Sequence, residues 1–288
     1  MPVVAQSGLR QRDVAVKALA TCILALLLIS CSADERQTPA PPPTTIPAVL
    51  LNVGISEHAS ALAPLWAGGY AEESDNAAVN FVSGSNAILF EDLETGRLDA
   101  ILVHHIPESA RAGQDLWFNP VALDGLVIVT HPQNTVASLT LAQVQGLFSG
   151  QLASWSGVGG AERHVQPFEQ ERSDGAHVIF TRRVMGATPI SINTIVQSDS
   201  PSLLEAVSAE PSAVGYTMLS ALQTGVQVIA IDGVMPTPAT VASQDYPLTV
   251  PLYFVATAEP QGALRAFVAW LQSAEGQAIV SEKVGTVR

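Results

Sequence analysis

Small and polar residues lead directly into a segment with helical periodicity at residues 170–180, in the sequence QERSDGAHVIF. The N–H groups of a helix's first turn bind an anion readily when a small-residue loop lets it approach. Asp174, however, puts a carboxylate where that anion would lie, and aspartate is a preferred N-cap whose oxygens accept the same N–H groups. The stretch therefore predicts either an anion site or a helix capped by its own side chain.

Motifs typical of enzymes are missing from the sequence. It has no G-x-S-x-G, no G-x-x-x-x-G-K-[ST], no H-E-x-x-H and no G-x-G-x-x-G after a strand. The six histidines are scattered, and no second ligand cluster accompanies the pair His104 and His105. We therefore expect no enzymatic activity, no cofactor and no metal site.

The composition favours a large folded core and argues against nucleic acid as a partner. Apolar residues make up 48% of the 288-residue chain and charged residues 14%, which is not the composition of a disordered protein. The formal net charge is −13, so a broad basic face for nucleic acid is not expected.

The N-terminus has the features of a bacterial lipoprotein leader. Three basic residues precede an apolar run at residues 18–30, which is too short for a comfortable membrane-spanning helix and suits a signal peptide. The run ends in LISC at residues 28–31, which resembles a lipobox. We therefore expect residues 1–30 to be removed and Cys31 to be lipidated, with acyl chains as the membrane anchor. The alternative is an ordinary secretory signal that happens to precede a cysteine.

The segment after the leader is expected to be a tether. Residues 31–46 are polar and then proline-rich, a composition that forms semi-extended, unpacked chain. Cys22 belongs to the leader and Cys31 would carry lipid, so the mature fold has no free thiol and cannot form a disulfide.

Short apolar runs alternate with helix-like segments from residue 48 onward, which predicts an α/β protein with a parallel or mixed sheet covered by helices on both faces. One helix has clear ends, since Thr140 and Gln143 form a capping box and Gly150 suits a left-handed C-cap. Asp174 and the pair Ser200-Pro201 are expected to open two further helices. The strands are expected at residues 48–55, 77–85, 98–105, 125–132, 164–168, 213–219 and 226–231, with an extended crossing segment at 246–257.

The chain resembles the phosphate-binding component of ABC-type phosphate uptake systems. The resemblance rests on FNPVALDGLVIVTHPQNTVASLTLAQVQGLFSGQLASWSGVGG, AVGYTML, YPLTVPLYF and FVAWLQSAEGQAIVSEKVG, which together cover most of residues 119–285. It implies a two-lobed type II periplasmic-binding-protein fold with two crossover segments. The implied lobes are residues 47–125 plus 246–288 and residues 126–245, with a ligand held between them.

Matching to the family's first two anion loops implies hydroxyl and backbone donors from the first lobe. In SEHAS the candidates are Ser60 and Ser56, although both residues could instead cap the following helix. In SGSNA the candidates are Gly84, which lets the backbone approach closely, and Ser85, although either could be simple turn chemistry.

The third loop, VHHIPES, departs from the family pattern. His105 matches the position where the family has an aspartate that accepts a proton from hydrogen phosphate. An imidazolium there would favour an anion without that proton, whereas a neutral imidazole could donate or accept. The strand also resembles one in tungstate-binding proteins. The alternative is a strand-end histidine bonded to backbone, and His104 is expected on the opposite face of the strand if the strand extends that far.

The fourth loop is the 170–180 stretch itself. Gln170 matches the family's arginine, and Asp174 and Ala176 replace its serine and final hydroxyl. Arg172 could substitute for the arginine with a different geometry, and Gly175 keeps its backbone freedom. The resemblance thus supports the fold and the location of the site more strongly than phosphate as the ligand.

These observations predict a lipid-anchored extracytoplasmic solute-binding protein of an ABC import system. It would be a monomer on the cell membrane that takes a small anionic solute, phosphate or a related oxyanion, and delivers it to a membrane permease. One alternative is a diverged homologue that acts as a cell-surface sensor or interaction lipoprotein. Another is a different ligand such as tungstate or molybdate.

Overall fold

The computed structural model describes residues 49–113 and 115–287. The expected signal peptide at residues 1–30, the lipidated Cys31 and the tether at residues 31–46 lie outside the described residues and stay predictions.

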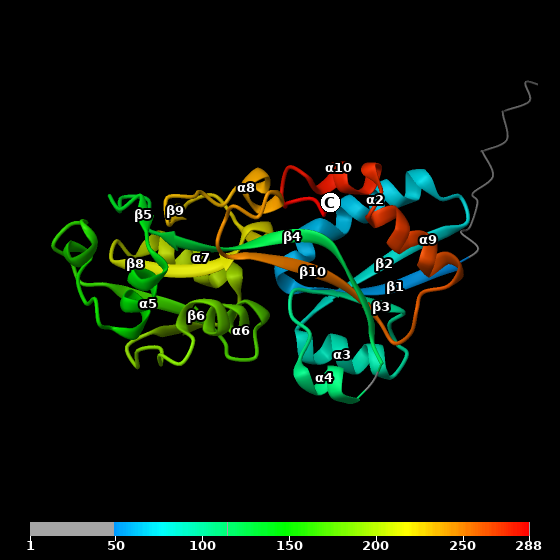
Figure 1. Ribbon diagram of the computed structural model, residues 1–288, viewed down its shortest axis with the longest axis horizontal. Helices are drawn as coiled ribbons and strands as arrows, with labels where there is room; N and C mark the ends of the chain where they lie inside the picture. The colour runs from blue at the N-terminus through cyan, green and yellow to red at the C-terminus, as the bar shows by residue number, and fades with distance from the viewer. Residues whose placement is uncertain (1–48, 114, 288) are drawn as a thin grey trace, which may run out of the picture. The chain divides into compact units, whose positions relative to one another are not determined.

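Ten strands join into one mixed sheet that runs through two lobes (Figure 1). The path of hydrogen-bonded neighbours is β2-β1-β3-β10-β4-β8-β6-β7, with β9 on β4 and β5 on β9. In the first lobe β1 lies between β2 and β3, and these pairs are parallel. In the second lobe β6 is parallel to both β7 and β8. The bounds are β1 Val49–Ser56, β2 Ala77–Gly84, β3 Ala100–Val103, β4 Trp117–Thr130, β5 Ser138–Leu139, β6 Gln166–Gln170, β7 Ile195–Gln197, β8 Ala213–Met218, β9 Gln227–Ile231 and β10 Thr249–Ala256.

Two antiparallel strands, β4 and β10, carry the chain between the lobes. The first part of β4 pairs with β10, and its last part, from Leu126 to Thr130, pairs with β8 and β9. β10 also pairs with β3, so its far end belongs to the first lobe. The extended crossing segment expected at residues 246–257 and the strand expected at 125–132 are therefore confirmed, although β4 begins eight residues earlier than predicted.

Helices cover both faces of the sheet in each lobe. The first lobe contains the 3₁₀ turn η1 Glu57–Leu62 and the helices α2 Ala63–Glu73, α3 Asn86–Glu94, α4 Glu108–Gly113, α9 Gly262–Leu271 and α10 Ala274–Val280. The second contains α5 Leu141–Ser149, the 3₁₀ turns η2 Trp155–Val158 and η4 Leu219–Ala221, α6 Gly175–Phe180 with its π-helical continuation η3 Thr181–Met185, α7 Ser200–Ala209 and α8 Pro238–Ala242.

Alternating side chains of single strands supply two hydrophobic cores in each lobe. In β3, Leu102 packs with the helices α2 and α9, whereas Ile101 packs with α3. In β4, Ile128 faces α5 and Val129 faces α7. Because successive strand residues point to opposite faces, this division shows a sheet buried on both sides, as the apolar strands predicted. The two-lobed α/β fold class is confirmed; the lobe boundaries at residues 47, 125 and 246 stay a prediction.

The helix ends follow the local signals. Thr140 and Gln143 form the predicted capping box, and Gly150 adopts φ of 80° at the C-cap. Asp174 is the N-cap of α6, as the aspartate predicted. In α7 the N-cap is Asp199, one residue before the predicted Ser200-Pro201 opening.

The C-terminal segment is bonded to β4 and packs against α8 of the second lobe. The N–H of Gly285 donates to the carbonyl of Leu123 at 2.7 Å, and the N–H of Leu123 donates to the carbonyl of Gly285 at 2.8 Å. A Cβ at Gly285 would lie 2.6 Å from the backbone nitrogen of Ala242 in α8. Only a glycine therefore permits this close approach.

Candidate functional site

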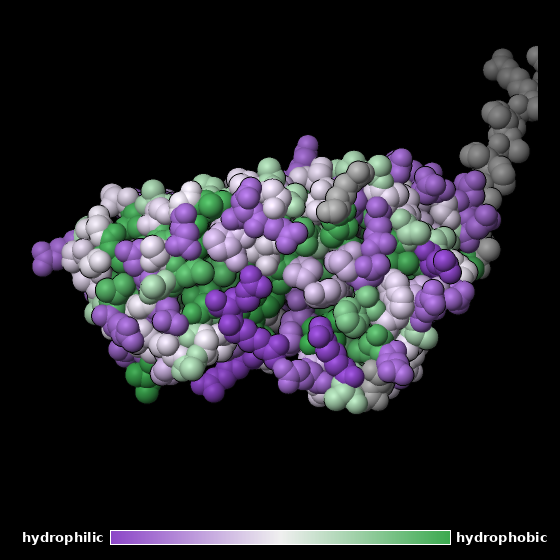
Figure 2. All heavy atoms as spheres, in the orientation of Figure 1, coloured by the Kyte–Doolittle hydropathy of each residue, from purple (hydrophilic) through white to green (hydrophobic). Residues whose placement is uncertain are grey.

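A cavity of about 120 Å³ lies between the lobes, where the carboxyl ends of several parallel strands meet. Ser56 ends β1, Gly84 ends β2, and Glu171 and Ser198 follow β6 and β7. Ligands of α/β proteins bind at this edge of a sheet, because loops and helix N-termini converge there. Figure 2 shows hydrophilic side chains gathered around the hollowed surface between α6 and α3. The lining residues are Ser56, Glu57, His58, Gly84, Ser85, Asn86, Glu171, Ser173, Asp174, Gly175 and Ser198.

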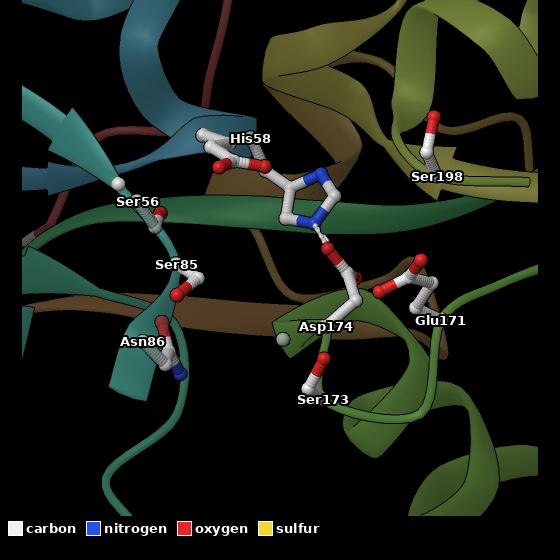
Figure 3. Close-up of a pocket in the computed structure, with 11 residues that line it drawn as sticks. Ser56, His58, Ser85, Asn86, Glu171, Ser173, Asp174 and Ser198 are labelled. Carbon is white, nitrogen blue, oxygen red and sulfur yellow. Dashed lines mark hydrogen bonds and ion pairs between the residues drawn. The ribbon is translucent and has the colours of Figure 1, made fainter. Parts of the chain in front are cut away.

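The first-lobe wall offers a helix start that no side chain caps. Ser85 is the N-cap of α3, yet its hydroxyl makes no capping hydrogen bond. The N–H groups of the first turn of α3 therefore lack the side-chain acceptor that usually covers them. Asn86, next in the chain, donates its side-chain N–H to the carbonyl of His105 at 3.2 Å. Ser85 and the start of α3 thus present donors to the cavity (Figure 3).

The second-lobe wall is occupied by the carboxylate of Asp174. Its Oδ1 accepts the N–H of Ala176 at 2.7 Å and that of His177 at 3.3 Å. Both carboxylate oxygens also lie 2.8 Å from Nε2 of His58, which comes from the first lobe (Figure 3). Burial by itself would raise the pKa of Asp174, but the hydrogen bond and charge of His58, with the two N–H groups, lower that pKa below its ordinary value.

His58 is enclosed and bonded at both ring nitrogens. The residue is 4% exposed, and its Nδ1 lies 2.9 Å from Oγ of Ser200 in the second lobe. A carboxylate only accepts, so Nε2–H donates to Asp174, and in the neutral ring Nδ1 then accepts the Ser200 hydroxyl. Ser200 also contacts Thr217 Oγ1 and accepts the side-chain N–H of Gln170, each at 2.9 Å.

A second histidine–carboxylate pair lies behind the first-lobe wall. Nε2 of His104 donates to Asp124 at 2.9 Å, and Nδ1 of His104 lies 3.4 Å from Oγ of Ser56. Asp124 is fully buried and also accepts the N–H of Gly125 and both the N–H and the hydroxyl of Ser220. In the neutral His104 ring, Nδ1 accepts the hydroxyl of Ser56, so this serine presents an oxygen acceptor to the cavity.

The structure brings together five of the residues proposed from the sequence. Ser56, Gly84, Ser85, Asp174 and Gly175 line the same cavity.

The other four proposed residues lie elsewhere. Ser60 donates to the carbonyl of Glu57 at 2.7 Å and lines a different cavity. Arg172 lines a separate hollow beside β7. Ala176 is buried and contributes only its N–H, to Asp174. His105 is half-buried outside the cavity, where burial lowers its pKa and the charges of Arg182 and Arg111 lower it further.

His104, not its neighbour, turns toward the site. The expectation that it would lie on the opposite strand face assumed a strand through residue 105, whereas β3 ends at Val103. The alternation of strand side chains therefore does not extend to either histidine.

His58 is the main residue that the sequence analysis missed. It lies two residues after the proposed Ser56, but nothing local connects it to Asp174, 116 positions away. Asn86, Glu171, Ser173 and Ser198 also line the cavity and were not proposed.

Comparison with known proteins gives the family. A family model described as PBP superfamily domain matches residues 41–275. The chain belongs to this superfamily. Over 159 residues it is 25% identical to the phosphate-binding protein PstS of Bacillus subtilis, a match that covers 54% of this chain and 52% of that protein. It is 21% identical over 174 residues to PstS of Borreliella burgdorferi, covering 56% and 62%. The chain thus matches about half to three fifths of the length of these relatives.

Solved structures agree on the fold. A Vibrio cholerae structure titled an ABC-type phosphate transport receptor superposes with a TM-score of 0.67 at 22% identity, covering 83% of this chain and all of that one. PstS from Borrelia burgdorferi gives 0.59 at 18% identity, covering 83% and 99%. The resemblance to phosphate-binding components is confirmed, and these superfamily relatives are binding proteins.

Three residues beside the cavity stand in the order of a catalytic triad. Ser56, His104 and Asp124 follow the order hydroxyl, imidazole, carboxylate, but the 3.4 Å separation at Ser56 exceeds the roughly 2.6–3.2 Å of an activated nucleophile. Among residues 49–113 and 115–287, no helix is long and apolar enough to cross a membrane. The same residues contain no cluster of three potential metal ligands.

Proposed function

We propose that this chain is a lipid-anchored, extracytoplasmic solute-binding protein that delivers a small oxyanion to the permease of an ABC importer. The observation that carries the proposal is the cavity between the lobes, at the carboxyl ends of β1, β2 and β6 and beside the uncapped start of α3. Its size suits one tetrahedral oxyanion. The hydroxyls of Ser85 and Ser173 are available as side-chain donors, whereas that of Ser198 is donated to Asp199 at 3.0 Å.

The charge of the walls narrows the class of anion. Glu57, Glu171 and Asp174 line the cavity, and no arginine or lysine stands among the described residues that do so. Like charges at this range disfavour a fully ionised ligand in a poorly hydrated site. We expect binding to favour anions of low charge, or those that still carry a proton.

Calorimetric titration of the full chain with phosphate, sulfate, molybdate and tungstate tests the ligand class. Ser85→Ala removes one hydrogen bond to a charged ligand and is expected to weaken binding about tenfold. Ser60→Ala is the matched control and should leave the affinity unchanged, because Ser60 bonds within its own turn. Absence of heat for all four anions, at concentrations that detect millimolar dissociation constants, rules out an oxyanion ligand. Equal losses in the two variants contradict the proposed site.

The anchor is tested separately from the ligand. Cys31→Ser should move the protein from the membrane fraction to the soluble fraction and abolish labelling by a radioactive fatty acid. Cys22→Ser should change neither, because this cysteine lies inside the proposed leader. Membrane retention of both variants argues against lipidation at Cys31.

A second candidate function is a cell-surface sensor or interaction lipoprotein. It is favoured by the His58–Asp174 contact, which joins the lobes through the protein's own side chains. Capture of an ABC permease by the anchored protein supports the importer component. Capture of a receptor protein, equally in the presence and absence of added anions, supports the alternative. The monomeric state, also a proposal, is checked by light scattering.

A further inference from the structure

The carboxylate of Asp174 is held as a bound anion would be held. Donors converge on it from both sides of the cleft: Nε2–H of His58 from the first lobe, and the N–H groups of Ala176 and His177 from the second. These contacts measure 2.7–3.3 Å. The carboxylate therefore uses the helix start that a solute anion would otherwise use.

We propose that Asp174 is a tethered internal anion, which keeps the two lobes closed without a solute and competes with any oxyanion for the same donors. The closure does not depend on the ligand class. The competition rests on the proposed function, since it requires that an oxyanion enters this cavity.

Helix capping alone does not explain the arrangement. Asp199 caps α7 in the same lobe through the N–H of Ser202 at 2.8 Å, and its other contact is with the neighbouring Ser198. Its described hydrogen bonds all stay within the second lobe. Asp174 caps α6 and, in addition, places both oxygens 2.8 Å from a ring of the opposite lobe. Of the two caps, only Asp174 has a described bond across the cleft.

His58 is fixed so that it can serve only this carboxylate. Its Nδ1 is bonded to Ser200, and its backbone carbonyl lies 2.8 Å from Oγ of Ser220, the hydroxyl that also meets Asp124. Both serines belong to the second lobe. His58, a first-lobe residue, therefore contacts the opposite lobe at Nε2, Nδ1 and its backbone oxygen. With the side chain only 4% exposed, the ring has no room to turn toward another partner without the lobes separating.

Tethering favours the internal carboxylate over a free anion. A group on the same chain has an effective concentration of roughly millimolar or more, so a free anion must exceed it or bind more strongly. If the internally closed form is 90–99% populated, the apparent affinity for a solute falls about 10–100-fold. Glu57 and Glu171 line the same cavity and repel both a solute anion and Asp174. They therefore do not change the advantage of the internal carboxylate over a free anion.

Spin-label distance measurements on the full chain test the closure. Cys22→Ser and Cys31→Ser remove both native thiols, and Ile88→Cys with Ile192→Cys place one label on each lobe, at side chains that are 56% and 97% exposed. The test variant is Asp174→Ser, since serine still caps a helix but cannot pair with His58. The matched control is Asp199→Ser, the same exchange at the other N-cap.

The labelled parent and the Asp199→Ser variant are expected to give one narrow distance distribution without added solute. Asp174→Ser is expected to give a longer and broader one. The closure is overturned if the parent distribution is already broad and Asp174→Ser leaves it unchanged. It is also overturned if Asp199→Ser changes the distribution as much as Asp174→Ser does. Circular dichroism checks folding, and if Asp174→Ser is unfolded, Asp174→Asn replaces it, with an expected intermediate distribution.

Titration with phosphate separates the two parts of the inference. If the Asp174 carboxylate competes with phosphate for the same donors, Asp174→Ser should bind phosphate at least tenfold more tightly than wild type. The affinity of Asp199→Ser should be unchanged. Equal affinities in wild type and Asp174→Ser overturn the competition. No heat in any variant refutes the proposed oxyanion ligand and the competition with it, while the spin-label distances still decide the closure.

Discussion

Two histidine–aspartate pairs lie within the same part of the molecule and differ in what surrounds them. His104–Asp124 is buried, with side-chain exposures of 2% and 0%, and the carboxylate receives three further hydrogen bonds from Gly125 and Ser220. His58–Asp174 joins opposite lobes, and its carboxylate is 11% exposed at the wall of a cavity. One pair belongs to the framework of the site, and the other can separate when the lobes move.

A hydrogen bond between a histidine and an aspartate therefore does not fix the role of the two residues, which depends on the groups that surround the carboxylate. A carboxylate with every acceptor position filled by fixed donors leaves nothing for a ligand to replace. A carboxylate whose partner sits on another rigid body can exchange that partner, because separating the lobes returns both groups to water. Three measurements follow from this comparison.

Breaking the buried pair should have the largest effect. Asp124→Ala leaves His104 and the Ser220 donors without their acceptor in a site closed to water. We expect the free energy of unfolding to fall by about 3–5 kcal/mol, measured by denaturant titration. Asp199→Ala, which removes a surface helix cap, should lower it by about 1 kcal/mol. If the two losses are equal, Asp124 is not the framework residue described here.

The cleft pair should show a pH dependence of defined sign. Its environment lowers the pKa of Asp174 below the ordinary 3.8, so the folded state favours the ionised carboxylate. The stabilisation is complete well above pH 3.8 and is lost as the pH falls through the lowered pKa. The difference in unfolding free energy between wild type and Asp174→Ser should therefore shrink in acid. A difference that grows in acid contradicts the assigned ionisation.

Breaking a third pair, which like His58–Asp174 spans the two lobes, should have almost no effect on stability. Arg182 and Glu108 approach to 3.7 Å with side chains that are 54% and 89% exposed. Water and salt screen such a pair, so Glu108→Gln should change the unfolding free energy by less than about 0.5 kcal/mol. The spin-label distance should likewise stay unchanged. A clear lengthening would show that this surface pair, rather than His58–Asp174, holds the lobes together.

Local signals in the sequence were sufficient for several helix ends, whereas the short strands β5 and β7 were not predicted. The capping box of Thr140, the left-handed Gly150 and the N-cap Asp174 each depend on residues within one helical turn, so a short window contains the whole interaction. Of the two alternatives for residues 170–180, the structure shows the helix capped by its own side chain, and the anion site stays a proposal. Asp174 does cap α6, and it does so beside the cavity.

Long-range partners were beyond the same reasoning. His58 contacts Asp174 and Ser200 only because β1 and β6 end at the same edge of the sheet. No residue pattern near His58 predicts this contact. The early end of β3 at Val103 likewise depends on tertiary packing, and it determines which histidine turns inward. The sequence could therefore indicate that Asp174 takes the N–H groups at the start of α6, but it could not show that His58 of the other lobe holds the same carboxylate.

The glycine contact near the C-terminus determines how the lobes can part. Gly285 bonds through its backbone to Leu123 and lies against Ala242 of α8, and Figure 1 shows α8 on the other side of the crossing strands β4 and β10 from α3 and α6. The bonds to Leu123 stay within the first lobe and the contact with Ala242 crosses to the second, whereas at the cavity the lobes are joined by side-chain bonds such as His58–Asp174. We therefore expect the close packing of Gly285 against α8 to limit separation on this side, so that any gap between the lobes opens more widely at the cavity.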